Sequence, residues 1–129
     1  GTAQHMPERD DQLLEVVQEA LEDRKGRDIQ VLDISERSSF ADYFVIATGT
    51  SDRHVGAIID HVREATKHAG YPAASGVEGE ATGDWLLLDL DSVVVHVMRA
   101  ETRAFYNLEA LWDETPQARG EAGESSVAE

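Results

Sequence analysis

The sequence contains no cysteine among its 129 residues. This absence excludes disulfide bonds, thiolate zinc sites and cysteine nucleophiles, and it is compatible with the reducing cytoplasm in which we expect the protein to act. Long apolar runs are also missing, since none approaches the roughly 20 residues that span a bilayer. No basic segment followed by an apolar one opens the chain, so we expect no export and no membrane partner.

Basic residues are scarce: 11 lysines and arginines stand against 26 aspartates and glutamates, which gives a formal net charge of −15. Nucleic acid is therefore a poor direct partner, because phosphate binding depends on clustered lysine and arginine side chains. A basic protein suits this surface better. The plain alternative is that net negative charge only keeps a small protein in solution.

The length predicts one domain with a single hydrophobic core. We expect that domain over residues 13–113. Residues 1–12 are predicted to be a tag remnant and an N-terminal tail, because Gly1–Met6 resembles the scar of a cleaved expression tag. Residues 114–129 have almost nothing to bury, and they are predicted to be a disordered acidic C-terminal tail.

Apolar residues at helical spacing predict two amphipathic helices. The first begins at Gln12 and is ended by Gly26. The second has Ser51 as its N-cap residue and runs to about His68, where Gly70 closes it. Their buried stripes consist of Leu13, Leu14, Val17, Ala20 and Leu21 in the first helix, and of Val55, Ile58, Ile59 and Val62 in the second.

Strands and a last helix complete the predicted architecture. The strands are expected over residues 29–34 and 43–48 and in a hairpin over residues 85–98, with residues 72–77 leading to a further strand beside the hairpin. A helix over residues 101–113 places Phe105, Leu108 and Trp112 on one face, where the aromatic rings could dock. Strand, glycine turn and helix in succession indicate a βαβ-like unit. The sequence thus predicts an α/β domain with about five strands and helices packed on the sheet.

The hairpin is the most regular part of the pattern. If Leu90 lies opposite Val93 across an Asp91-Ser92 turn, the pairs Leu88/Val95 and Leu86/Val97 follow on one wholly apolar face. We expect this face to cover the main core. The opposite face mixes large apolar residues with an acid and an imidazole; it consists of Trp85, Leu87, Asp89, Val94, His96 and Met98.

Candidates for catalysis are few. Asp89 and Asp91 stand two positions apart, as carboxylates do that bridge divalent cations in nucleotidyl-transfer sites, although a hairpin turn is the favoured interpretation. His54, His61 and His68 recur every two helical turns, about 10.5 Å apart, which is too far for one ion, so we expect them to be solvated. No catalytic residue, metal site or cofactor site is predicted, and we expect no enzyme.

Four ordered blocks of sequence resemble a known family. The blocks are 41–51, Glu78-Gly79, the two hairpin strands 85–89 and 93–97, and a last block with Arg103, Tyr106–Glu109 and Leu111-Trp112. In these blocks the chain is similar to the ribosomal silencing factor family, also called RsfS or Iojap-like, and the resemblance covers residues 13–113. It departs from the family at the Leu90-Asp91-Ser92 turn and at Met98.

The resemblance implies a fold and a function. The fold is an α/β domain with a mixed sheet, similar to nucleotidyltransferases in topology but without their catalytic residues. The function is translational repression: family members bind the large ribosomal subunit through its fourteenth protein and block joining of the small subunit. Two alternatives stay open, a metal-dependent nucleotidyltransferase-like enzyme and a homo-oligomeric module, for which exposed Leu87 and Met98 could support a homodimer.

The predicted partner-binding residues combine aromatic rings with charged groups, because tyrosine and tryptophan often dominate binding energy and carboxylates pair with basic side chains. The aromatic residues could instead belong to the core. The carboxylate of Asp89 is costly to bury unpaired, so we expect it to join an internal network with His96 or Arg103, or to face a cationic partner. The full set is Tyr43, Glu78, Asp84, Trp85, Leu87, Asp89, His96, Arg103 and Tyr106.

Overall fold

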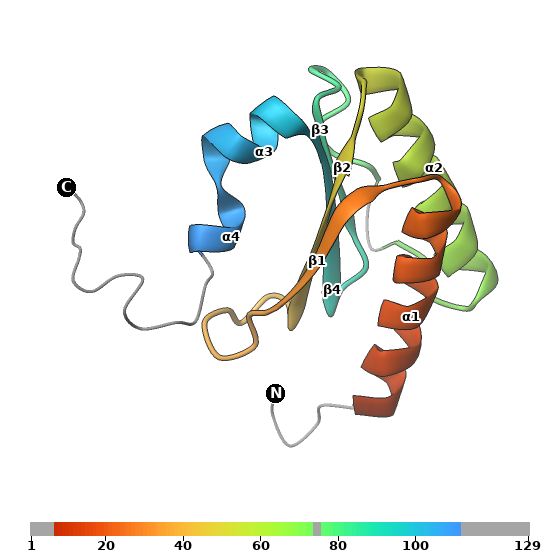
Figure 1. The fold of residues 1–129 in the computed structure, drawn as a ribbon. Helices are drawn as coiled ribbons and strands as arrows, with labels where there is room; N and C mark the ends of the chain where they lie inside the picture. Colours follow the sequence, from red (N-terminus) through yellow and green to blue (C-terminus); the bar gives the residue numbers. More distant parts are fainter. Residues whose placement is uncertain (1–6, 74–75, 112–129) are drawn as a thin grey trace, which may run out of the picture.

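The protein is an α/β domain in which a mixed sheet lies between two layers of helices (Figure 1). The structure, a computed structural model, describes residues 7–73 and 76–111. No helix in these two stretches is long and apolar enough to cross a membrane. The elements of the predicted hairpin and of both predicted amphipathic helices are present, and the α/β prediction is confirmed.

The sheet has the strand order β1-β2-β4-β3. Its central strands β2 and β4 run parallel, whereas both outer strands pair antiparallel with their neighbours. A parallel pair needs a long crossover connection, which here contains helix α2 (Asp52–His68) and strand β3. The bounds are Arg27–Asp33 for β1, Tyr43–Gly49 for β2, Trp85–Asp89 for β3 and Val93–Arg99 for β4.

The described residues form four strands rather than about five. The further strand to which residues 72–77 were expected to lead is not found, because residues 72, 73, 76 and 77 have no regular structure and residues 74 and 75 lie outside the described residues. Only Glu78, just beyond this segment, pairs with Leu87 in an isolated bridge on the outer edge of β3.

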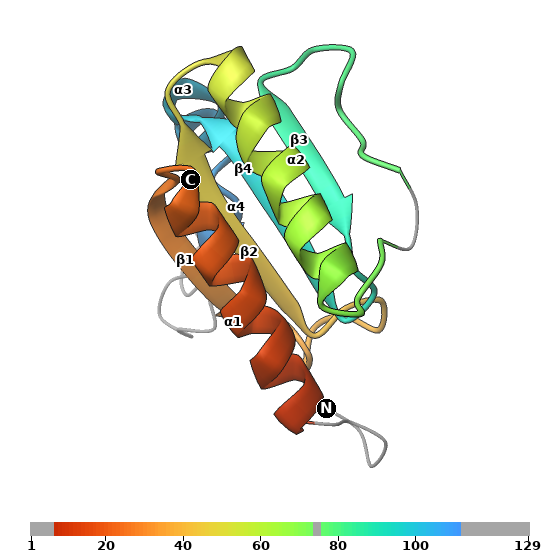
Figure 2. The same cartoon turned by 90° about the vertical axis from the view of Figure 1, so that its right-hand side faces the viewer.

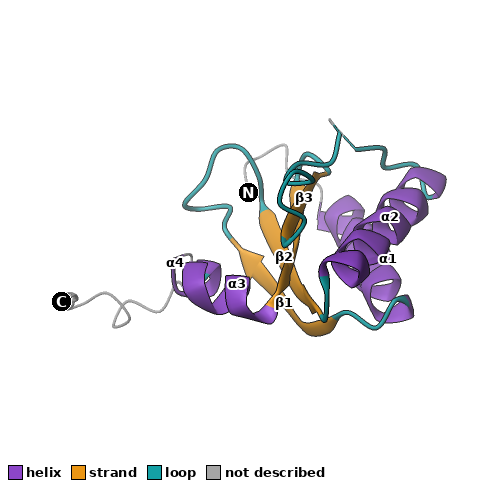
Figure 3. Ribbon diagram, turned by 90° about the horizontal axis from the view of Figure 1, so that it is seen from above, coloured by secondary structure: helices purple, strands orange, loops and turns teal. Residues whose placement is uncertain are grey.

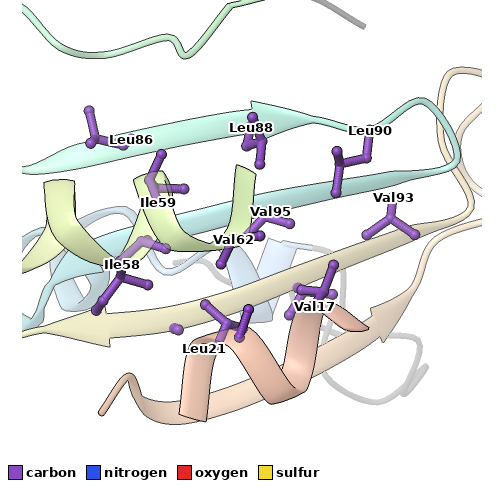
Figure 4. Close-up of a cluster of buried hydrophobic side chains, with 14 of the residues drawn as sticks. Val17, Leu21, Ile58, Ile59, Val62, Leu86, Leu88, Leu90, Val93 and Val95 are labelled. Atoms are coloured by element: carbon purple, nitrogen blue, oxygen red, sulfur yellow. The ribbon is translucent and has the colours of Figure 1, made fainter. Parts of the chain in front are cut away.

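Helices α1 (Pro7–Asp23) and α2 (Asp52–His68) lie side by side over one face of the sheet (Figure 2). Their apolar stripes meet the aliphatic side chains of β2, β3 and β4 in the main core. Figure 4 shows this layer. Leu86 pairs with Val97 and Leu88 with Val95, so the predicted hairpin register and the core-facing role of its aliphatic face are confirmed.

The helix ends follow local sequence signals. Ser51 caps α2, and its Oγ accepts a hydrogen bond of 3.0 Å from the backbone N–H of His54, as predicted. Helix α1 begins at Pro7, earlier than the predicted Gln12. Proline is favoured at the first helical position, but the apolar periodicity used for the prediction starts only at Leu13.

Helices α3 (Ala100–Tyr106) and α4 (Leu108–Leu111) lie over the other face of the sheet (Figure 3). The single helix predicted over residues 101–113 is wrong. Asn107 adopts the left-handed conformation with φ of 51°, which asparagine tolerates, and this residue ends α3. Phe105 does not dock, because its side chain is 80% exposed, and Trp112 lies outside the described residues.

Candidate functional site

The pleat of the sheet decides which predicted binding residues can meet. Successive strand residues point to opposite faces, and the α1/α2 face takes Val45, Leu86, Leu88, Val95 and Val97. The opposite face, which we call the mixed face, therefore presents Trp85, Leu87 and Asp89 from β3. It also presents Val94, His96 and Met98 from β4 and Phe44 from β2. Tyr43 does not belong to the mixed face, because it packs against the main core on the other side.

Five of the nine predicted residues line one pocket of about 310 Å³, which we call the mixed-face pocket. Antiparallel pairing explains its place: the start of β3 lies beside the end of β4, so the loop before β3 meets the helix after β4. The backbone N–H of Arg99 donates to the carbonyl oxygen of Asp84 at 3.0 Å and fixes this junction. The pocket is lined by Glu78, Gly79, Thr82, Asp84, Trp85, Leu87, Thr102 and Tyr106.

Trp85 lines the pocket and is held by contacts with β4 and α3. Its Nε1–H donates a hydrogen bond of 3.1 Å to Nδ1 of His96 on the adjacent strand. Its ring contacts that of Tyr106 on α3, with the centroids 4.8 Å apart and the planes at 51°. Trp85 is half-buried, whereas the Tyr106 side chain is 54% exposed. Tyr106 is therefore a surface residue rather than a core aromatic.

His96 is buried, with 3% of its surface exposed, and so it is not itself a contact residue. Because an indole N–H only donates, the Nδ1 atom of His96 must accept, and the neutral ring carries its proton on Nε2. That nitrogen has no hydrogen-bond partner among the described residues, and the ring packs edge-on against Phe44 at 4.6 Å. Burial lowers the pKa of His96 from its ordinary value of 6.5 to about 4.

The segment before β3, residues 78–84, which we call the acidic loop, is held to the sheet at Glu78. Its N–H donates to the carbonyl oxygen of Leu87, and its own carbonyl accepts from the Leu87 N–H, both at 3.0 Å. Gly79 follows with φ of +97°, and an added Cβ would lie 2.1 Å from the carbonyl oxygen of Trp85. Only glycine permits this approach, so the Glu78-Gly79 pair positions the Glu78 carboxylate at the pocket.

Asp84 is a fixed carboxylate at the pocket wall. Thr102 on α3 donates a hydrogen bond of 2.9 Å from its Oγ1 to Oδ2 of Asp84. This bond, followed by one from Thr82, lowers the pKa of Asp84 below its ordinary value, because both favour the charged form. Asp84 therefore presents a stable negative charge at neutral pH.

Asp89 caps the hairpin turn, since its Oδ1 accepts a hydrogen bond of 2.9 Å from the backbone N–H of Asp91. His96 bonds to Trp85, and Arg103 bonds to Glu109 and Thr48, so the structure does not support the internal network expected for Asp89. The turn interpretation of Asp89-Leu90-Asp91 is supported instead, because Asp91 has φ of 77° and the Leu90 N–H donates to the Val93 carbonyl at 2.8 Å. No cluster of three metal-ligating side chains occurs within residues 11–73 and 76–111.

Arg103 is a residue of α3 whose side chain bonds to two other elements. Its Nε donates to Oε2 of Glu109 at 2.8 Å, and its NH1 donates to Oγ1 of Thr48 at 2.8 Å. The side chain is 11% exposed, so its charge is neutralised inside the protein rather than offered to a partner. Arg103 thus ties α3 to α4 and to β2.

Three pocket residues were missed by sequence reasoning, namely Gly79 as a lining residue, Thr82 and Thr102. Thr82 and Thr102 are short polar residues without a motif, and only the meeting of loop and helix gives them a role. Gly79 belongs to the family-like Glu78-Gly79 block and to the acidic loop, neither of which indicated a lining role. The side chain of Met98 is fully buried, which removes one of the two exposed residues on which the homodimer prediction depended.

The prediction that the histidines of α2 are solvated is wrong for two of them. His54 Nδ1 accepts from the Thr50 backbone N–H at 2.9 Å, and its Nε2 donates to the carbonyl oxygen of Arg24 at 2.7 Å. His61 Nε2 donates to the Asp23 carboxylate at 3.2 Å. Both histidines tie α2 to the end of α1, which lies beside it.

Comparison with known proteins assigns the class of protein that this sheet and pocket define. The sequence profile described as "Ribosomal silencing factor during starvation" matches residues 7–129. A protein of Haemophilus influenzae named ribosomal silencing factor RsfS is 41% identical over 100 residues, covering 78% of this chain and 97% of that protein. The chain therefore belongs to the ribosomal silencing factor family, whose members are regulatory proteins rather than enzymes.

Two further relatives extend the comparison. A crystal structure of a protein from Chromobacterium violaceum is 42% identical and superposes with a TM-score of 0.76, covering 79% of this chain and 84% of the other. A mouse protein named "Mitochondrial assembly of ribosomal large subunit protein 1" is 36% identical over 114 residues, covering 87% of this chain and 49% of that protein. The predicted family is confirmed. The names of its members also confirm a role in translation regulation rather than an enzymatic function.

Proposed function

We propose that the protein represses translation in the cytoplasm by binding the large ribosomal subunit through its fourteenth protein and so blocking the joining of the small subunit. Family membership supports a role at the ribosome, and the name of the mouse relative refers to the large subunit. The nucleotidyltransferase-like topology that the resemblance implied belongs to the same proposal.

The mixed-face pocket is the observation that carries this proposal. It gathers Glu78, Asp84, Trp85, Leu87 and Tyr106, five residues from three separate segments, at one accessible place. Aromatic rings with carboxylates beside them suit a basic protein surface, because the rings supply rigid contact area and the charges supply orientation. With a net charge of −15, direct nucleic-acid recognition is a weaker account.

Co-sedimentation with isolated ribosomal subunits tests the proposal. The protein is expected to pellet with large subunits and not with small subunits, and to reduce the formation of complete ribosomes when both are mixed. Leu87→Ala should weaken large-subunit binding, whereas Asp60→Asn on the exposed side of α2 should leave it unchanged. Wild-type protein that remains in the supernatant with large subunits would remove the proposal.

The particular partner on the subunit needs its own measurement. Purified fourteenth protein of the large subunit should bind directly, and an excess of it should release the repressor from large subunits. Binding to intact subunits that this competitor does not affect would assign the contact to another ribosomal component. A homodimer stays a proposal with less support, because Met98 is buried, and sedimentation at several protein concentrations tests it.

A further inference from the structure

Most side-chain donors of the mixed-face pocket are engaged within the protein. Thr102 donates its hydroxyl proton to Asp84, and the hydroxyl of Thr82 is within hydrogen-bond reach of both Asp84 and the carbonyl oxygen of Gly79, the latter at 3.3 Å. The indole N–H of Trp85 is bonded to His96. These three side-chain donors are thus engaged within the protein, the Tyr106 hydroxyl is the fourth side-chain donor of the lining, and Glu78 and Asp84 contribute its two carboxylates.

The charges around the pocket are equally one-sided. Its lining holds two carboxylates, and no lysine or arginine occurs among these lining residues. The nearby cation Arg103 is bonded to Glu109, and Arg99 is shared between Glu101 at 3.0 Å and Asp52 at 3.6 Å. Arg99 acts on Asp84 only as the smallest of the causes that lower its pKa, and no basic side chain belongs to the lining that holds Glu78 and Asp84.

Aromatic rings complete the surroundings. The Trp85 and Tyr106 rings lie 4.8 Å apart beside the carboxylates, and both rings line the pocket. Ring faces attract cations, and the planar guanidinium of arginine both stacks on them and pairs with carboxylates. The volume of about 310 Å³ lies at the lower end of the roughly 300–1,000 Å³ of small-molecule sites, which suits one side chain better than a cofactor.

We propose that the mixed-face pocket binds a single arginine side chain of the partner, with the guanidinium against Trp85 and Tyr106 and between the carboxylates of Glu78 and Asp84. This inference rests on the proposed function for its partner, a basic ribosomal protein. It goes further by naming the side chain that anchors the complex and the residues that select it.

Titration with a blocked amino acid tests the pocket without any ribosome. Acetyl-arginine amide is the probe, and acetyl-citrulline amide, its uncharged counterpart, is the matched control. In a Trp112→Phe background the only remaining indole N–H signal in nuclear magnetic resonance spectra belongs to Trp85. Acetyl-arginine amide should shift this signal in a saturable way at millimolar concentration, and acetyl-citrulline amide should shift it far less.

Variants of the acidic loop provide the second arm. Asp84→Asn and Glu78→Gln should each weaken binding of the arginine probe roughly tenfold, as expected for loss of a charge-assisted contact. Glu80→Gln removes the same charge from the same loop but lies outside the lining, so it should change the affinity less than twofold. Thermal unfolding of the three variants is the control, and each is expected to unfold cooperatively like the wild type.

The outcomes separate this inference from the proposed function. Equal shifts by the arginine and citrulline probes, or equal effects of Glu80→Gln and Asp84→Asn, would overturn the arginine site even if large subunits still bind. Selective arginine binding by a protein that fails to pellet with large subunits would retain the site and remove the ribosomal assignment.

Discussion

The two faces of the sheet are built from the same strands but differ in chemistry. The face under α1 and α2 is aliphatic apart from Tyr43 at the start of β2, and its side chains on β3 and β4 are buried. The mixed face carries Trp85, His96 and Leu87 and is only partly covered by the short helices α3 and α4. One strand, β3, serves both: Leu86 and Leu88 point into the core, while Trp85 and Leu87 point to the pocket.

This difference indicates a division between stability and recognition. Burying a leucine side chain completely contributes about 2 kcal/mol by removing apolar surface from water, and the α1/α2 face does this repeatedly. The mixed face instead leaves Trp85 half-exposed and holds it by a hydrogen bond to a buried histidine. A rigid, partly exposed aromatic residue costs little entropy when a partner binds.

The neighbouring leucines of β3 provide the largest expected effect. Leu88→Ala should lower the free energy of unfolding by between about 3 and 5 kcal/mol, because it opens a cavity in a fully buried site. Leu87→Ala should cost only about 1 kcal/mol, since that side chain is half-exposed, and should weaken large-subunit binding instead. Denaturant unfolding measures both, and equal losses would contradict the division between the faces.

Acid should destabilise the mixed face through His96. The folded state has a pKa of about 4 for His96, below the ordinary 6.5 of the unfolded chain, so between these values the unfolded state binds more protons. Stability is therefore fully present above pH 6.5 and is lost as the pH falls towards 4, by up to roughly 3 kcal/mol. His96→Asn, which does not titrate, should show a shallower fall in unfolding free energy than the wild type between pH 6.5 and 4.

Two glycines with positive φ separate backbone strain from steric conflict. Gly79→Ala should destabilise the protein by about 2 kcal/mol or more and displace the acidic loop, because the new methyl group meets the Trp85 carbonyl. Gly70→Ala should cost about 1 kcal/mol, since its φ of +95° is also unfavourable but nothing lies within 4 Å of the added Cβ. If both variants behave alike in thermal unfolding and in large-subunit binding, the close approach at Gly79 has no role in the pocket.

The smallest expected effect concerns the charge of Asp84. Thr102→Val removes the hydrogen bond that contributes most to the lowered pKa of Asp84, so that pKa should rise towards its ordinary value. Thr82→Val should raise it less, because its bond is the weaker cause. Carboxyl chemical shifts followed through an acid titration report both pKa values. A larger rise in the Thr82 variant would contradict the assigned geometry.

Local patterns predicted the parts of the fold that local physics decides. The pairing of Leu88 with Val95 follows from alternation and a tight turn, and the Ser51 cap follows from one hydroxyl before an apolar helix. The break at Asn107 was not visible, because asparagine is compatible with a helix until tertiary contacts choose the left-handed conformation. A fifth strand likewise depends on pairing between distant segments, and within the described residues only Glu78 pairs with the outer edge of β3.

The candidate site was predicted in part for the same reason. Trp85, Leu87 and the acidic loop are close in sequence, and their meeting follows from the hairpin. The placement of Tyr43 requires knowing which strands pair in parallel, and this information is absent from its own segment. His96 is buried against Phe44 and Trp85, and Arg103 is buried where it bonds to Glu109 and Thr48, so neither side chain could be assigned to partner or interior beforehand.

The absence of cysteine permits a direct test of the central claim that the mixed face contacts the ribosome. Single-cysteine variants Glu78→Cys at the pocket and Asp60→Cys on α2 each remove one exposed carboxylate and can each be labelled with a bulky maleimide. Binding of the labelled proteins to isolated large subunits is then measured by co-sedimentation. We expect the label at residue 78 to abolish binding to large subunits and the label at residue 60 to leave it intact. Binding that persists with residue 78 labelled and is lost with residue 60 labelled would contradict it.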